Sequence, residues 1–237
     1  RALPDGLSDI QNGMADIEHH MLHFLDNHDE QRLASPEFAG TPQKGKPLMV
    51  VSTTISTSPT MVYFGQEVGE AGNENAGFGT HSRTSIFDYI GVPNHQRWMN
   101  GGKFDGGQLT QEEKELRDFY KRILNFSLNS TALMGEYQEI QTVNRQTTQG
   151  YDPGIYAFTR WSDTQKLVIV TNFSWLSTSN FELKIPSEII RKWNLNDGNY
   201  TVTDQLYNKS TVQLQVLNGE GKAQITIAPS ESFIYQL

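Results

Sequence analysis

The stretch Met21-Leu22-His23-Phe24-Leu25-Asp26-Asn27-His28-Asp29 passes from an apolar run directly into a polar cluster. A short, nearly continuous apolar run is typical of a strand that is covered on both faces of a parallel sheet. Met61-Val62-Tyr63-Phe64 is a second run of this kind, and it ends in Gly65-Gln66-Glu67. The segment 46–58 between the runs is apolar with small residues, which indicates a helix that covers the sheet. This order predicts consecutive β/α units.

A capping box marks the start of the next predicted element, because Thr110 is followed three residues later by Glu113. The apolar residues that follow recur at helical spacing: Leu116, Phe119, Tyr120, Ile123 and Leu124. We therefore predict a helix over 111–129. The Gly-rich stretch 65–107 before it is long for a loop in a compact domain, and loops of that length tend to be functional.

The sequence pattern changes near residue 130. All six histidines precede that point. Beyond it, apolar residues alternate with polar ones, as in Val212-Gln213-Leu214-Gln215-Val216, and Asn218-Gly219 is a turn signal. This alternation predicts an antiparallel β-sandwich. The expected fold class is thus α/β plus all-β, with a β/α region over 1–130 and a sandwich over 131–237.

Composition excludes several classes of protein. The chain has 237 residues and a formal net charge of −8, so it lacks the basic surface that a nucleic-acid partner requires. No apolar stretch is long enough for a membrane-spanning helix. The absence of cysteine excludes disulfides and thiol nucleophiles. Because the chain starts at Arg1 without an initiator Met or a signal-peptide pattern, we expect it to derive from a longer precursor.

The polar cluster over 26–30 is the strongest candidate site. It follows a predicted parallel strand, where α/β barrels place catalytic residues. A carboxylate, an imidazole and a carboxamide in a small volume suit hydrogen bonds to vicinal sugar hydroxyls. The alternative interpretation is a polar turn that caps a strand. Arg83, Arg97 and Trp98 lie in the long loop, where Arg could donate to a sugar and Trp could stack on one. Trp98 could equally anchor that loop.

Metal and nucleotide sites are disfavoured. In a strand, His20 and His23 would point to opposite faces, and no HExxH pair is present. The glycines of the long loop match neither dinucleotide nor P-loop spacing. There is no G-x-S-x-G elbow that would support a serine hydrolase.

Phe24-Leu25-Asp26-Asn27-His28-Asp29 is similar to the F-x-x-N-H-D motif of the α-amylase family, glycoside hydrolase family 13. Pro59-Thr60-Met61-Val62-Tyr63-Phe64-Gly65-Gln66-Glu67 resembles the P-x-x-x-Y-x-G-Q-E segment at the eighth barrel strand of that family. Residues 83–89 and the capped helix also resemble it. The resemblance implies the last two β/α units of a (β/α)8 TIM barrel followed by a β-sandwich C-terminal domain. It implies a retaining glycoside hydrolase or transglycosylase of α-1,4-glucans.

By this resemblance, Asp29 would be the catalytic carboxylate that stabilises the transition state, and His28 would bind the same sugar. Asn27, Arg83 and Tyr63 would be substrate-binding residues. The implied ligand is an α-glucan or maltooligosaccharide. No cofactor or metal site is assigned, although calcium occurs in the family. A periplasmic or extracellular location is favoured by the resemblance alone.

One departure from the family pattern is large. The family's nucleophile Asp and acid/base Glu precede the F-x-x-N-H-D motif, and neither motif occurs in the residues before Phe24. We therefore expect a missing N-terminal barrel segment as partner, and an inactive chain when it is alone. The alternatives are a non-catalytic carbohydrate-binding or interaction fragment and a metal-dependent enzyme built on the His cluster.

Overall fold

The computed structural model describes residues 4–73, 83–84, 86 and 92–237. The helices are α1 Pro4–Gly13, α2 Lys46–Thr54, α3 Pro93–Met99, α4 Gln111–Asn129, α5 Gln141–Thr147 and α6 Ser187–Lys192. The 3-10 helices are η1 Glu18–His20, η2 Pro42–Gly45, η3 Gln66–Val68, η4 Asn100–Gly102 and η5 Thr131–Met134. The strands are β1 Glu136–Glu139, β2 Ile155–Trp161, β3 Lys166–Asn172, β4 Ser179–Ile185, β5 Gly198–Asp204, β6 Thr211–Leu217, β7 Glu220–Ile227 and β8 Ser232–Gln236. Within the described ranges, no helix has the length and apolar character needed to cross a membrane.

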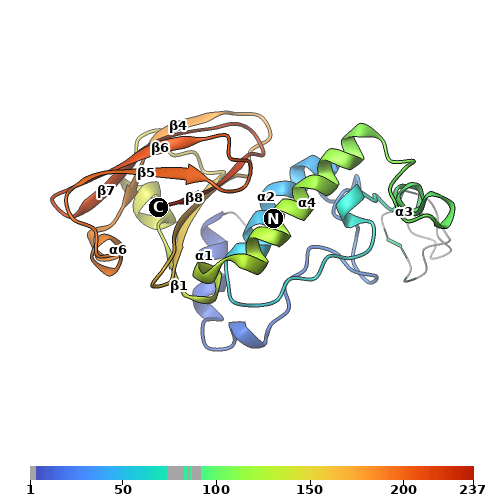
Figure 1. Cartoon of the computed structure of the whole chain (residues 1–237), viewed down its shortest axis with the longest axis horizontal. Coiled ribbons are helices and arrows are strands. Elements are labelled where there is room, and N and C mark those ends of the chain that lie inside the picture. The colour runs from blue at the N-terminus through green and yellow to red at the C-terminus, as the bar shows by residue number, and fades with distance from the viewer. Residues whose placement is uncertain (1–3, 74–82, 85, 87–91) are drawn as a thin grey trace.

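The strands lie at one end of the molecule and α3 at the other, with α2 and α4 between them (Figure 1). All eight strands belong to one antiparallel sheet in the order β1-β2-β3-β8-β5-β6-β7-β4. The predicted all-β region is confirmed, but the two separate sheets of a sandwich are replaced by one curled sheet. The reason is the short ladder of two pairs, Thr203 with Gln236 and Asp204 with Tyr235, which joins β5 to β8.

The strands β2, β3 and β8 are buried on both faces. In β2, Ile155 and Ala157 face the core inside the curled sheet, whereas Tyr156 and Phe158 face the core under the helices. The outer strand β4 has one covered face only, since its burial alternates residue by residue. The helical region therefore covers one side of the sheet, around β2, β3 and β8.

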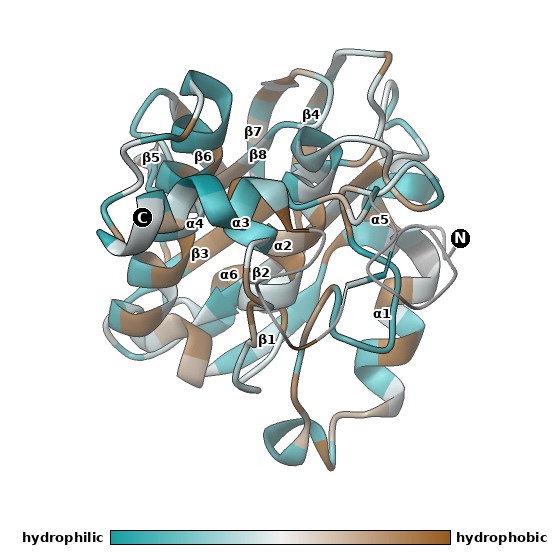
Figure 2. Ribbon diagram, turned by 90° about the vertical axis from the view of Figure 1, so that its right-hand side faces the viewer, coloured by the Kyte–Doolittle hydropathy of each residue, from teal (hydrophilic) through white to brown (hydrophobic). Residues whose placement is uncertain are grey.

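Helices α2 and α4 form that cover. Met49 and Val50 of α2 and Phe119 and Ile123 of α4 share a buried cluster with Ile169 of β3. Viewed from the α3 end, the helices lie in front of the hydrophobic stretches of the sheet (Figure 2). The predicted boundaries of α4 are confirmed, and its capping box joins the Thr110 side chain to the Glu113 backbone N–H and the Glu113 carboxylate to the Thr110 N–H.

A buried arginine ties the helical region to the sheet. Arg160 of β2 is fully buried and donates to the carbonyl of Ile55 at 2.7 Å, directly after α2. It also donates to the carbonyls of Leu133 at 2.5 Å and Gly135 at 3.2 Å, in the connection from α4 to β1. Burial lowers the pKa of the Arg160 guanidinium to about 10. These bonds fix three segments that are distant in the sequence.

The two strands predicted over 21–25 and 61–64 do not form as regular strands. They are reduced to a single parallel bridge between His23 and Thr60, in which the Met61 N–H donates to the His23 carbonyl at 2.8 Å. Met21, Leu22 and Phe24 remain 38%, 48% and 42% exposed. A parallel strand is covered when it has neighbours on both sides, and the described residues supply a neighbour on one side only.

The shared core predicts that α4 and the sheet unfold together. Ile123→Ala removes a fully buried side chain from the cluster under the helices, so we expect a loss of about 2–5 kcal/mol in the free energy of unfolding. Urea titration followed by far-UV circular dichroism and tryptophan fluorescence should give one coincident transition. Leu128→Ala on the same helix is the control, because Leu128 is 82% exposed and should change stability by less than about 0.5 kcal/mol. Equal effects of the two substitutions would contradict the shared core.

Candidate functional site

The loop after the parallel bridge is shaped by Asn27. Its side-chain oxygen accepts hydrogen bonds from the backbone N–H groups of Asp29 at 2.8 Å and Glu30 at 2.9 Å. This is the local turn that Asn side chains favour, because the carboxamide replaces a backbone acceptor. The turn presents the side chains of His28 and Asp29 to solvent.

His28, Asp29 and Arg83 lie together at the surface. His28 Nε2 is 3.4 Å from one Asp29 oxygen, and Arg83 Nη2 is 3.6 Å from the other. The same Arg83 nitrogen donates to the His28 carbonyl at 3.4 Å. The Asp29 side chain is 70% exposed and that of His28 54% exposed, so both are accessible to a ligand. Two predicted catalytic residues and one predicted binding residue are thus adjacent.

A buried ion pair supports this loop from below. Asp26 and Arg32 are both fully buried, and Arg32 Nε lies 3.5 Å from Asp26 Oδ2. The same oxygen accepts the Leu33 N–H at 2.8 Å. Burial raises the pKa of the Asp26 carboxyl, and the Arg32 charge and the Leu33 N–H oppose that shift. The pair holds the two ends of the 26–33 segment together.

Arg32 also connects the loop to three other segments. Its guanidinium donates to the Phe64 carbonyl at 2.7 Å, to the Glu70 carbonyl at 3.4 Å and to the Thr84 hydroxyl at 3.4 Å. It lies 4.8 Å from the centre of the Tyr63 ring, a cation–π contact. Tyr63 is half-buried, and burial raises the pKa of its phenol. Tyr63 is thereby placed in the same cluster as the loop.

Sequence reasoning did not identify Arg32 or Thr84 as part of this arrangement. Both are fully buried, and their contacts are made across an irregular loop, so no periodic pattern marks them. Residues 85 and 87–89 of the stretch that resembles the family lie outside the described residues. The two interpretations of residues 26–30, a polar turn and a candidate site, are compatible. Asn27 forms the turn, and the neighbouring side chains of His28 and Asp29 are exposed.

The other candidates from the long loop have structural contacts. Arg97 forms an ion pair with Glu113, which raises the pKa of Arg97, and Trp98 stacks on His95 with ring centres 5.6 Å apart. The Trp98 ring also lies 5.4 Å from the Arg117 guanidinium of α4, and this contact favours the interpretation of Trp98 as an anchor. His23 Nδ1 lies 3.1 Å from the Ser52 carbonyl. Across the part of the chain that the structure describes, no three His, Asp or Glu residues are grouped so as to hold a metal ion.

The β-rich region is similar to a known domain family. Residues 146–237 match the family model described as the alpha amylase C-terminal all-beta domain. By this match, residues 146–237 are an α-amylase C-terminal domain. No curated protein sequence matches the chain.

Solved structures extend the likeness from the α-amylase C-terminal domain to the helical region. A noncanonic maltogenic alpha-amylase, AmyB, from Thermotoga neapolitana has a TM-score of 0.65 at 14% identity, covering 100% of this chain and 46% of that one. The alpha-amylase GTA from Geobacillus thermoleovorans, complexed with acarbose, has a TM-score of 0.64 at 14% identity, covering 97% and 42%. An Anoxybacillus alpha-amylase has a TM-score of 0.62 at 17% identity, covering 98% and 41%. The chain spans less than half of each structure, and these identities show the fold alone.

The buried pair predicts how the loop responds to substitution. Asp26→Ala removes the partner of Arg32 and the acceptor of the Leu33 N–H, so the free energy of unfolding should fall by about 3–5 kcal/mol. Asp26→Asn keeps an acceptor for that N–H and should cost less. Glu30→Gln is the control, because Glu30 is exposed in the same loop. Denaturant titration measures the loss of unfolding free energy, which should be largest for Asp26→Ala, smaller for Asp26→Asn and smallest for Glu30→Gln. Equal losses for Asp26→Ala and Glu30→Gln would contradict the supporting role of the ion pair.

Proposed function

We propose that this chain is the C-terminal part of a retaining α-amylase-type glycoside hydrolase or transglycosylase that acts on α-1,4-glucans. The observation that carries the proposal is the contact of His28, Asp29 and Arg83 on the exposed loop that follows the parallel bridge. The α-amylase C-terminal domain that follows in the chain supports it. So does the likeness of the whole chain to one end of solved α-amylases.

In this proposal, Asp29 accepts hydrogen bonds from sugar hydroxyls and places negative charge near the oxocarbenium-like transition state. Hydrogen bonds that strengthen in that state contribute several kcal/mol in glycosidases. Arg83 holds the Asp29 carboxylate from one side and His28 from the other, so the carboxylate is oriented before substrate binds. Neither role requires a metal or an organic cofactor.

The remaining predicted residues take supporting parts. Asn27 uses its oxygen for the turn, which leaves the amide nitrogen as the group that donates to a hydroxyl. The Tyr63 ring, held by Arg32, forms a wall beside the loop. Binding of an α-glucan chain against an aromatic wall and a row of polar side chains is the usual arrangement for a sugar, because each ring has an apolar face and polar edges.

The nucleophile and the acid/base must come from polypeptide that precedes this segment in the family. We propose that the region 1–130 supplies the last two β/α units of a (β/α)8 barrel and that 131–237 is the C-terminal domain. The exposed apolar side chains of Met21, Leu22 and Phe24 support this, since neighbouring barrel strands would cover them. The solved relatives, which are more than twice as long, support it as well.

A non-catalytic carbohydrate-binding fragment is the second candidate. It is favoured by the fact that the residues before Phe24 include no match to the family's nucleophile or acid/base motif. Both candidates bind a glucan, so binding does not separate them. Turnover by the longer protein does.

The chain alone should not hydrolyse α-glucosides, because one carboxylate cannot act as nucleophile and acid/base together. Purified 237-residue chain incubated with maltoheptaose should release no reducing sugar above a heat-treated sample. Turnover that Asp29→Asn abolishes would overturn the proposal that the nucleophile lies elsewhere.

In the longer protein that contains this segment, Asp29→Asn should lower kcat by about 10²–10⁴, the equivalent of several kcal/mol, with a smaller change in KM. An interaction that is made mainly in the transition state has this effect. Steady-state kinetics on maltooligosaccharides measures both constants. Glu30→Gln is the matched control, since it removes a neighbouring exposed charge and should leave kcat unchanged. A normal kcat for Asp29→Asn would reduce Asp29 to a turn residue.

A further inference from the structure

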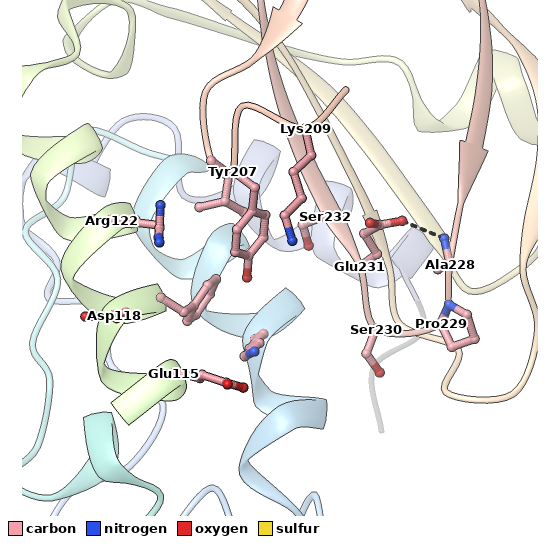
Figure 3. Close-up of a pocket in the computed structure, with 13 residues that line it drawn as sticks. Glu115, Asp118, Arg122, Tyr207, Lys209, Ala228, Pro229, Ser230, Glu231 and Ser232 are labelled. Atoms are coloured by element: carbon pink, nitrogen blue, oxygen red, sulfur yellow. Dashed lines mark hydrogen bonds between the residues drawn. The ribbon is translucent and has the colours of Figure 1, made fainter. Parts of the chain in front are cut away.

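A cavity of about 580 Å³ lies between the helical region and the α-amylase C-terminal domain (Figure 3). Its walls are the first residue of α2, one face of α4, and two segments of the C-terminal domain, 206–209 and 228–232. None of the residues proposed for glucan binding lines it. The cavity is larger than a single water-filled gap, so it has room for a small molecule.

Three cationic residues line this cavity: Lys46, Arg122 and Lys209. Among the described residues, none of the three lies within ion-pair distance of a carboxylate. The two lysines make cation–π contacts with aromatic rings. Lys46 Nζ lies 5.5 Å from the centre of the Phe119 ring, and Lys209 Nζ lies 5.2 Å from the centre of the Tyr207 ring. Burial lowers the pKa of the Lys46 ammonium; Glu115 opposes that shift and Lys209 adds to it.

Three carboxylates also line the cavity: Glu115, Asp118 and Glu231. Glu231 is engaged by the backbone N–H of Ala228 at 2.8 Å, the bond drawn in Figure 3. Asp118 is exposed and lies on the side of α4 away from Lys209. Glu115 is the carboxylate whose charge acts on Lys46. The cationic and anionic residues of the lining are therefore equal in number, but Glu231 is directed toward Ala228 and Asp118 away from Lys209.

The hydroxyl of Ser232, in the wall of the cavity, has no hydrogen-bond partner among the described residues. The residue is 4% exposed, and its Oγ is buried. Buried polar groups are nearly always paired, so an unpaired hydroxyl in the wall of a cavity that Lys46 and Lys209 also line indicates an acceptor that belongs there. This observation is independent of the charged residues.

We propose that the cavity binds a phosphate group, as free phosphate or as a phosphomonoester, between Lys46 and Lys209 with the Ser232 hydroxyl as a further donor. A phosphate oxygen offers the acceptor that Ser232 lacks, and its charge offsets the repulsion between two neighbouring ammonium groups. The Tyr207 ring, which lies between Lys209 and Arg122 at 5.2 and 6.0 Å, would contact the organic part of an ester. Glu115 would accept hydrogen bonds from its hydroxyls.

Isothermal titration calorimetry of the full 237-residue chain at constant ionic strength tests this site, with inorganic phosphate, glucose 1-phosphate and glucose as probes. We expect saturable binding of at least one phosphate-containing probe and none of glucose. Lys46→Gln combined with Lys209→Gln should weaken that binding at least tenfold. The matched control is Lys114→Gln combined with Lys121→Gln, which removes the same charge from exposed positions of α4 and should leave affinity unchanged.

Ser232→Ala provides a second variant with little risk to folding, and it should weaken binding about tenfold while the melting temperature stays within a few degrees. Tighter binding of glucose 1-phosphate than of phosphate would identify an ester as the ligand, and equal binding would identify the free ion; both support the site. Absence of saturable binding would overturn the proposal. Equal weakening by the two lysine pairs would also overturn it, because it would reduce the effect to overall charge.

Discussion

Every residue of β2 is buried, and this constraint organises the rest of the structure. A strand with no face in water must be covered on both sides, so its alternate side chains divide between two cores. One core is closed by the curl of the sheet itself. The other exists only while α2 and α4 lie on the sheet. The helical region and the α-amylase C-terminal domain are therefore held together by apolar burial, in addition to the covalent connection after α4.

This burial also explains the bonds of Arg160. The Arg160 guanidinium, one residue before the end of β2, cannot reach water, so its donors need acceptors inside the protein. The carbonyls after α2 and after α4 accept hydrogen bonds from its two terminal nitrogens. Because these carbonyls lie where each helix ends, the same bonds fix the two helices relative to the strand. Arg160 thus fixes the position of α2 and α4 on the sheet, because the rest of their contact with the sheet is apolar and has no directional bonds.

The elements that were predictable from the sequence are those whose signal is local. The boundaries of α4 follow from its capping box and its single apolar stripe, and β6 and β7 follow from alternation on a half-buried face. The strand β2 lacks such a signal, because burial on both faces removes the alternation. The apolar run over 21–25 predicted a strand that the structure does not form. Its composition suits a strand covered on both faces, but the described residues leave Met21, Leu22 and Phe24 exposed. One curled sheet in place of a sandwich depends on two residue pairs between β5 and β8, which no local pattern encodes.

The candidate site shows the same division between local and distant causes. The motif gives the position of Asn27, His28 and Asp29, and the turn made by Asn27 follows from its own chemistry. What places the turn is not local. Arg32 binds the carbonyl of Glu70, and the Glu70 carboxylate accepts the N–H of Asn94 at the start of α3 at 2.9 Å.

From α3 the polar contacts continue to α4. Arg97 Nε lies 3.1 Å from both oxygens of Glu113, and Glu113 is the capping residue of α4. The turn that carries Asp29 is therefore connected by charged and hydrogen-bonded side chains to the helix that packs on the sheet. The α-amylase C-terminal domain therefore helps to fix the site from a distance, because it packs against α4, and α4 holds the start of the series of contacts that ends at Arg32.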